Sequence, residues 1–131
     1  MFDNLKNFTP VQASLLNSQE LAFIGDAVYS VIIRNMLVCK GNQKTNELHK
    51  SANKFVKASA QFDALKVIMP LLTEQELDIV RRAKNYKTNN IAKHASIEEY
   101  KNATAFEALI GYLYISNQIE RLEELVSQCM N

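Results

Sequence analysis

Two carboxylates stand alone in apolar stretches of this sequence that have helical spacing. Asp26 is the one charge in LAFIGDAVYSVII (residues 21–33), and Glu107 is the one charge in ATAFEALIGYLYIS (residues 103–116). Gly25 directly precedes Asp26, and Gly111 follows Glu107 by four residues, one turn later on the same helix face. Glycine inside a helix costs about 1 kcal/mol relative to alanine, so its presence suggests that another helix, a water or an ion approaches the acid.

Lone carboxylates of this kind allow two interpretations. A buried carboxylate must be paired, protonated or bound to metal. Either each acid caps a neighbouring helix or pairs with Lys or Arg, or the two helices cross and both acids face one hard cation, which prefers oxygen ligands. The helix around Asp26 is apolar on almost every side and is expected to be central and buried. Its neighbours three and four residues from Asp26 cannot neutralise the acid: they are Ala22, Phe23, Tyr29 and Ser30.

The apolar spacing predicts an all-α fold, and 131 residues suit one compact domain over residues 1–131. The 3 glycines and 2 prolines are too few for a strand-and-turn architecture. Gly41 and Pro70 are expected to end helices, and the polar residues 85–95 are expected to form a loop. Helices are predicted from Pro10 (capped by Thr9), over 18–39, over 46–69 with a bend or break midway, from the capping box TEQE at 73–76, from SIEE at 96–99 to about 115, and over 120–129.

Composition limits the function classes. The formal net charge is +1, so any binding of nucleic acid must depend on local clusters of charge. The chain has no uninterrupted run of about 18 apolar residues, which predicts no membrane span. Cys39 and Cys129 form neither a disulfide framework nor a metal-ligand pattern and are expected to be buried or idle thiols in a reducing compartment. These features predict a cytoplasmic protein.

Four segments carry a resemblance to a known family. LAFIGDAVY resembles the signature helix of ribonuclease III, and ATAFEALIGYLY resembles that family's second acidic helix. NELHKSANKFVKASAQ (residues 46–61) and VRRAKN (residues 80–85) look like the Mini-ribonuclease III branch, which consists of the catalytic domain without a double-stranded-RNA-binding domain. IGDAVY and FEALIG in this order are specific, whereas either alone would be weak. The resemblance covers nearly the whole chain.

The resemblance implies the ribonuclease III endonuclease-domain fold, a two-fold homodimer and Mg²⁺-dependent cleavage of double-stranded RNA. Asp26 and Glu107 are then both the catalytic residues and the metal ligands. Hydrolysis of the phosphodiester by a metal-activated water would leave 5′-phosphate and 3′-hydroxyl ends. The implied substrate is a ribosomal RNA precursor (23S), and a ribosomal protein on that RNA is a further candidate partner.

The chain also departs from the larger ribonuclease III enzymes. Those enzymes carry additional acids at the positions of Gln19, Ala22 and Thr104. The short branch looks similar in having Ala and Thr there, so the departures do not argue against activity. They reduce the acidic ligands to Asp26 and Glu107, which favours one firmly held Mg²⁺ whose shell is completed by water and RNA phosphate.

Two groups of basic and polar residues are candidates for RNA binding, because duplex RNA is recognised mainly through its shape, phosphates and 2′-hydroxyls. No acid occurs between Asp78 and Glu98, so this segment is locally basic. The alternative is a solvated helix end, since cations favour a helix C-terminus. The first group comprises Arg81, Arg82, Lys84, Asn85 and Lys87, followed by Lys93 and His94. The second comprises Lys44, Asn46, His49 and Lys50; Lys54 and Lys57 suit a solvated face equally well.

Four single residues complete the assignments. The hydroxyl of Thr104 bonds either a metal-bound water or its own helix backbone, and the residue is grouped with the RNA site. His49 is expected to pack or to position another group rather than to act as a base. Phe23 and Tyr29 are assigned to the dimer interface, where the resemblance places Phe23 in the partner subunit.

Three functions are weighed. The first is an active dimeric endoribonuclease, and the second is a non-catalytic RNA-binding or scaffold protein of the same fold. The third is a helical metal-dependent hydrolase of small nucleotides. Retention of both Asp26 and Glu107 favours the first, while the basic segment and the lack of a glycine-rich nucleotide loop count against the third.

Overall fold

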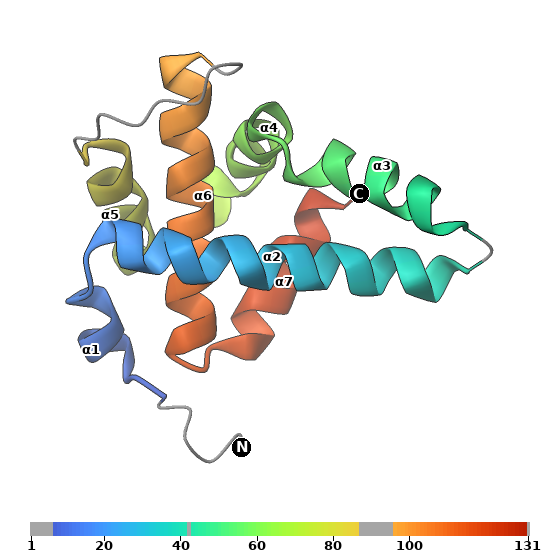
Figure 1. The fold of residues 1–131 in the computed structure, drawn as a ribbon. Helices are drawn as coiled ribbons and strands as arrows, with labels where there is room; N and C mark the ends of the chain where they lie inside the picture. Colours follow the sequence, from blue (N-terminus) through green and yellow to red (C-terminus); the bar gives the residue numbers. More distant parts are fainter. Residues whose placement is uncertain (1–6, 42, 87–95, 131) are drawn as a thin grey trace.

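Helices make up nearly all of residues 7–41, 43–86 and 96–130, which are the residues that this computed structural model describes (Figure 1). These ranges contain no strand, so the predicted all-α class is confirmed. The expected loop over 85–95 lies largely outside them. The helices are α1 (Pro10–Ser14), α2 (Ser18–Lys40), α3 (Thr45–Val56), α4 (Ala58–Ile68), the short 3-10 helix η2 (Met69–Leu71), α5 (Glu74–Lys84), α6 (Ile97–Ile115) and α7 (Ile119–Cys129).

Local side-chain chemistry sets the helix ends. The hydroxyl groups of Thr9 and Thr73 each accept a hydrogen bond from the backbone N–H of the third helical residue, Gln12 and Glu76 respectively. The side chains of Gln12 and Glu76 in turn accept a hydrogen bond from the backbone N–H of the threonine, which completes a capping box. Ser96 accepts a hydrogen bond from the third backbone N–H of α6 at 3.0 Å. Gly41 ends α2 with a φ of 74°, a value that suits glycine. The predicted region 46–69 breaks at Lys57, whose ψ of 155° is extended, into α3 and α4.

The central helix is α6, not the helix of Asp26. α6 contacts α1, α2, α4, α5 and α7. Its residues 105–113 are buried except for Glu107, which is half-buried. In this core Tyr29 of α2 meets Phe106 of α6 edge to face, with ring centroids 4.9 Å apart. α6 is apolar on every side because other helices surround it.

Protein covers α2 on only part of its circumference. It packs against α6 and α3, whereas Phe23 is 80% exposed and Val31 is 66% exposed. Asp26 is exposed as well, so the expectation that this acid is buried is wrong.

By length and composition α2 is apolar enough to cross a membrane. Its mean hydropathy is 1.6 over 18 residues, which differs from the expectation that the chain contains no such stretch. The core helix of a soluble protein passes the same test, and α2 contributes Leu21, Ile33 and Leu37 to this core.

α2 and α6 cross at the glycines that lie beside the two acids. A Cβ atom at Gly25 would overlap the carbonyl oxygen of Glu107 and would lie 2.9 Å from the backbone nitrogen of Gly111. A Cβ atom at Gly111 would overlap the carbonyl oxygen of Leu21. Each glycine therefore admits the backbone of the other helix, and no side chain fits between the two helices at this point.

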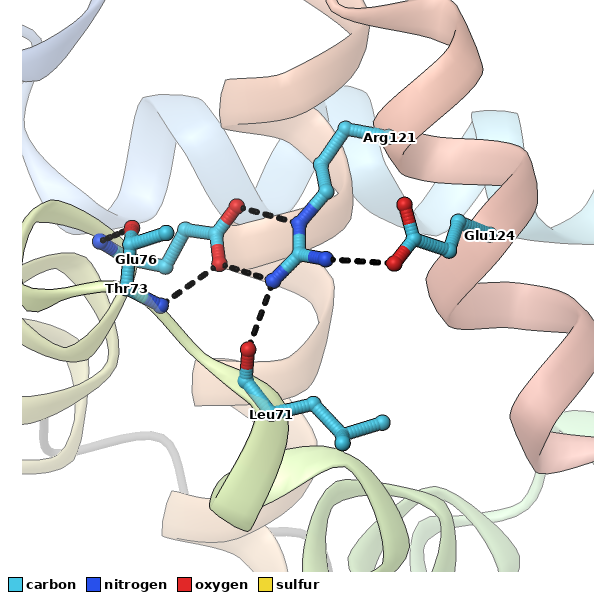
Figure 2. A network of polar contacts seen from close by, with 5 residues as sticks. All are labelled: Leu71, Thr73, Glu76, Arg121 and Glu124. Carbon is cyan, nitrogen blue, oxygen red and sulfur yellow. Dashed lines mark hydrogen bonds and ion pairs between the residues drawn. The ribbon is translucent and has the colours of Figure 1, made fainter.

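A buried ion pair joins α7 to the start of α5. Glu76 is 3% exposed, and its two carboxylate oxygens accept hydrogen bonds from Arg121 at 2.8 and 3.0 Å (Figure 2). Arg121 also donates to the carbonyl oxygen of Leu71 at 2.7 Å. Burial raises the pKa of Glu76, but hydrogen bonds from Arg121 and Thr73 outweigh it, so the pKa lies below its ordinary value. The network fixes α5 and α7 relative to each other on the scaffold around α6.

Gly25→Ala is expected to destabilise the fold by more than ~4 kcal/mol, because α2 and α6 must separate to admit the methyl group. Helix propensity alone predicts the opposite, a gain of about 1 kcal/mol. The free energy of unfolding in urea measures the difference. Gly41→Ala is the control, since nothing lies within 4 Å of a Cβ there. Backbone strain should limit its loss to ~1–3 kcal/mol. A Gly25→Ala protein as stable as wild type would contradict the close crossing.

Candidate active site

Asp26 and Glu107 come together where α2 crosses α6. The backbone of Gly25, next to Asp26, lies directly against the backbone of Glu107. The carboxyl groups are close enough that a hydrogen bond to Asp26 raises the pKa of Glu107. Because the two acids lie far apart in the sequence, their meeting depends on this helix crossing.

The two acids differ in burial, and burial changes the protonation of Glu107. Asp26 is exposed, whereas Glu107 is half-buried. The pKa of Glu107 is raised from 4.5 to about 8. Burial is the largest cause, and a hydrogen bond to Asp26 and the negative charge of Asp26 raise the pKa further. A hydrogen bond from Gln61 lowers it but does not outweigh these causes. At neutral pH the carboxyl group of Glu107 therefore keeps its proton in the metal-free protein.

No basic side chain among residues 7–41, 43–86 and 96–130 neutralises this pair. Within the described ranges, neither acid forms an ion pair with Lys or Arg. Neither acid caps one of the described helices, so the structure gives no support to the pairing or capping alternative. The polar neighbour of Glu107 is a neutral amide: Nε2 of Gln61 in α4 donates to Oε2 of Glu107 at 3.4 Å.

The pair fits a hard divalent cation. Two carboxylates with no compensating positive charge are a ligand set that Mg²⁺ prefers. The part of the chain that the structure describes contains no cluster of three or more His, Cys, Asp or Glu side chains that could hold a metal. Asp26 and Glu107 are thus the acidic ligands that this site could offer, and the remaining positions of the shell would fall to neutral oxygen atoms.

The candidate RNA-binding residues around α3 are all exposed. Lys44 immediately precedes the helix, and Asn46, His49 and Lys50 lie in its first two turns. His49 and Arg34 border a small pocket of about 240 Å³ between α2 and α3. The side chains of this group are therefore accessible to an RNA backbone.

The candidates on α5 are less free than the sequence suggests. Arg81 pairs with Asp78 at the surface. Nη2 of Arg82 donates to the carbonyl oxygen of Ser14 at 2.7 Å, and its Nε lies 3.3 Å from Asp78. Arg82 thus ties α5 to α1, and these contacts favour a structural role over RNA binding for this residue. Lys84 is half-buried and Asn85 exposed at the end of the helix, and Lys87, Lys93 and His94 lie outside the described residues.

The described members of the two groups lie on or beside separate helices, α3 and α5. α3 and α5 lie on opposite sides of α6 (Figure 1), so the groups flank the helix that carries Glu107. Thr104 lies one turn before Glu107 on α6 and is half-buried, which leaves both interpretations of its hydroxyl open.

Comparison with known proteins decides the family. The profile of the ribonuclease III domain matches residues 19–118. The chain belongs to the ribonuclease III family. A Mini-ribonuclease 3 of Brevibacillus brevis is 51% identical over 115 residues, which are 88% of this chain and 86% of the relative. A Mini-ribonuclease 3 of Thermoanaerobacter is 46% identical over 124 residues, which are 95% of this chain and 87% of the relative.

A solved structure supports the same fold for this ribonuclease III domain. The crystal structure of a Fusobacterium nucleatum protein aligns with a TM-score of 0.81 and 31% identity, covering 92% of this chain and 94% of the other. The resemblance to the Mini-ribonuclease III branch is therefore confirmed, as is the helical endonuclease-domain fold. As a member of this family, the chain is an endoribonuclease.

The two residues assigned to the dimer interface of this ribonuclease III domain lie in opposite environments. Phe23 is 80% exposed and free to meet a partner, so its assignment stays a prediction. Tyr29 is only 2% exposed and packs against Phe106 within its own chain. The assignment of Tyr29 to the interface is wrong, because the crossing with α6 covers that face of α2.

Sequence reasoning missed Gln61. This residue ends the segment NELHKSANKFVKASAQ, but no role was assigned to it there. Its side chain is 2% exposed and touches Glu107. The pattern of α4 contains a signal, because the buried positions 61, 64, 65 and 68 lie on one helix face and Gln61 is the one polar residue among them.

Glu107→Gln is expected to remove a decline in stability with pH in the metal-free ribonuclease. Between pH 4.5 and about pH 8, Glu107 keeps its proton in the folded protein but releases it in the unfolded chain. The free energy of unfolding should therefore fall as the pH rises through this range. The free energy of unfolding should fall by ~2–4 kcal/mol between about pH 5 and about pH 8, since one pKa unit corresponds to ~1.4 kcal/mol. Urea unfolding in EDTA at about pH 5 and about pH 8 measures it.

Asp63→Asn is the matched control for this experiment, because Asp63 is an exposed acid of α4. The control should keep the decline in stability seen in the wild type. Equal pH dependence of Glu107→Gln and wild type would refute the raised pKa of Glu107.

Proposed function

We propose that this endoribonuclease is Mg²⁺-dependent and cleaves double-stranded regions of structured RNA, with the 23S ribosomal RNA precursor as substrate and a ribosomal protein on that RNA as a further partner. The products would carry 5′-phosphate and 3′-hydroxyl ends. The family match and the Mini-ribonuclease 3 relatives support action on double-stranded RNA. The observation that carries the proposal of metal dependence is the pair of acids at the crossing of α2 and α6, which has no basic partner in the part of the chain that the structure describes.

Asp26 and Glu107 would hold the Mg²⁺ ion, which when bound activates water and stabilises the negative charge that develops at the phosphate and on the leaving 3′-oxygen. Glu107 must lose its proton to serve as a ligand, and the exposed Asp26 presents its carboxylate on the side that solvent and RNA can reach. No histidine is needed as a base. The half-buried Thr104 lies one turn from Glu107, within the same region of α6.

Cationic and polar side chains from two parts of the chain would bind the RNA backbone. Phosphate contacts fix the register of the duplex and carry no sequence information of their own. The proposed contacts are Lys44, Asn46, His49 and Lys50 around α3, Arg81, Arg82, Lys84, Asn85 and Lys87 in the sequence from the second half of α5 onward, and Thr104 on α6. Arg82 is the weakest member of this set, since its guanidinium already binds α1 and Asp78.

A two-fold homodimer of single catalytic domains is part of the proposal. The uncovered side of α2 continues into an apolar groove of about 680 Å³ that Val28, Val31 and Ile32 line with Leu122 and Val126 of α7. A second copy would remove this apolar surface from water. Function favours the same arrangement, because two antiparallel strands need two oppositely directed sites and a two-fold axis supplies them.

A cytoplasmic location follows from the substrate and fits the two free thiols. Cys39 is exposed, and burial raises the pKa of the half-buried Cys129 to about 11, which makes it unreactive. A reducing compartment tolerates both.

The alternative function, a non-catalytic RNA-binding or scaffold protein of the same fold, would leave the two acids without a purpose. A half-buried carboxylate with a pKa of about 8 destabilises the ionised fold and is explained more simply by a site that uses it.

Asp26→Asn and Glu107→Gln should each abolish Mg²⁺-dependent cleavage while the protein stays folded and still binds RNA, because each removes an acidic ligand without changing side-chain shape. Gel analysis of a duplex RNA incubated with and without Mg²⁺ shows the discrete cuts of the wild type. Asp63→Asn, the same change at an exposed acid, should cut normally. Near-normal cleavage by either active-site variant at saturating Mg²⁺ would show that the metal-ligand assignment is wrong.

Phe23→Ala should loosen the dimer and favour single-strand nicks over double-strand cuts. Burial of a phenylalanine contributes ~1.5–3 kcal/mol on each side, so the dimer dissociation constant should rise about 100-fold or more. Analytical ultracentrifugation measures the constant. Val67→Ala, at a 52% exposed apolar residue of α4, is the control and should leave it unchanged. A wild-type monomer at micromolar concentration that still cuts both strands would refute the dimer.

A further inference from the structure

We propose that Gln61 is a positioning residue of the active site, whose amide N–H holds the Glu107 carboxylate in the orientation that the divalent cation requires. The inference rests on the proposed metal-dependent function. It adds a third helix, α4, to a site that α2 and α6 build with their acids.

The geometry starts at the break between α3 and α4. Lys57 is extended, and α4 begins at the next residue, so that Gln61 lies in the first turn of the new helix with its backbone N–H bonded to the carbonyl oxygen of Lys57 at 3.0 Å. Its side chain is 2% exposed, and Nε2 lies 3.4 Å from Oε2 of Glu107. Between the residues that the structure describes, this is the one hydrogen bond of the Gln61 side chain.

The position of Gln61 is one where packing alone favours an apolar residue. The other buried residues on this face of α4 are Ala64, Leu65 and Ile68. Burying an amide among them opposes folding unless its polar atoms find partners. A leucine or methionine of similar volume would pack there without that requirement, so the amide is best explained by the carboxylate that it contacts.

The chemistry of an amide suits a neighbour of a metal ligand. An ionised carboxylate only accepts hydrogen bonds, so the amide must present its NH₂ group to Glu107. Lys or Arg could donate the same hydrogen bond, but its positive charge would neutralise the pair and compete with the cation. A neutral donor fixes one oxygen of Glu107 and leaves the net negative charge of the site intact. Partners of this kind orient ligands at metal sites in general.

Gln61→Met tests the role with a side chain of similar volume that cannot donate. The variant should fold with a free energy of unfolding at or above that of the wild type, since it places an apolar residue at a core position. Its affinity for Mn²⁺, measured by calorimetry on the protein without RNA, should fall about 10–100-fold. The Mg²⁺ concentration for half-maximal cleavage should rise by a similar factor, with kcat at saturating Mg²⁺ changing less.

Asn102→Leu is the matched control. Asn102 is a buried amide, 8% exposed, on the same helix as Glu107, and its Nδ2 donates to the carbonyl oxygen of Glu98 at 2.8 Å. It should change stability but leave Mn²⁺ affinity at the wild-type value. Gln61→Asn is a second test variant, because it keeps the amide but shortens its reach by one methylene, and it should also lose Mn²⁺ affinity.

Wild-type Mn²⁺ affinity and Mg²⁺ dependence in Gln61→Met or in Gln61→Asn would overturn the inference while leaving the proposed function in place. Failure of the proposed function gives a different result. In that case the wild type would bind no Mn²⁺, or Asp26→Asn would bind it as tightly as the wild type does, and the role of Gln61 would fall with the metal site.

Discussion

The contact between the backbones of α2 and α6 at Gly25 and Gly111 is the constraint on which the site depends. Each glycine lies where a Cβ would overlap a carbonyl oxygen of the other helix, so the two helices approach more closely than any pair with side chains at the crossing could. That approach places Asp26 beside Glu107, since each acid is within one turn of its glycine. The same contact closes the core around Tyr29 and Phe106. The stability of the fold and the proposed catalytic site therefore depend on the same helix crossing.

Two acids that lie together without a bound cation repel each other when both are ionised, and this changes the protonation of the metal-free protein. Burial and the charge of Asp26 raise the pKa of Glu107 to about 8, so at neutral pH the pair avoids a double negative charge by keeping a proton. The buried Glu76 differs, because its carboxylate is paired with Arg121. The two sites differ in this respect: Glu76 has a permanent cation in Arg121, whereas Glu107 has no ion-pair partner among the described residues, which supports the metal site proposed for it.

The exposed apolar side of α2 reflects a second constraint. A small helical domain has room for one helix that is surrounded on all sides, and here that helix is α6. α2 is nearly as apolar but lies at the edge, which leaves Phe23, Val31 and the groove toward α7 open. Apolar surface of this extent is characteristic of an interface. The same helix thus has one side in the core, one that carries Asp26, and one that is apolar and exposed and that the proposed dimer would cover.

The sequence by itself determined the elements of this protein and its family. Capping residues at Thr9, Thr73 and Ser96, the stop at Gly41 and the helical spacing are local signals that depend on neighbouring residues only, so the predicted helices agree closely with the structure. The lone acids and their glycines pointed to a crossing. The tertiary structure alone decided which helix is central, that Asp26 is exposed, and that Tyr29 lies in the core. It also decided that Arg82 binds α1 and that Gln61 reaches Glu107. These are contacts between helices that are distant in the sequence, and the side of a helix that another helix covers cannot be inferred from apolar spacing when nearly every side is apolar.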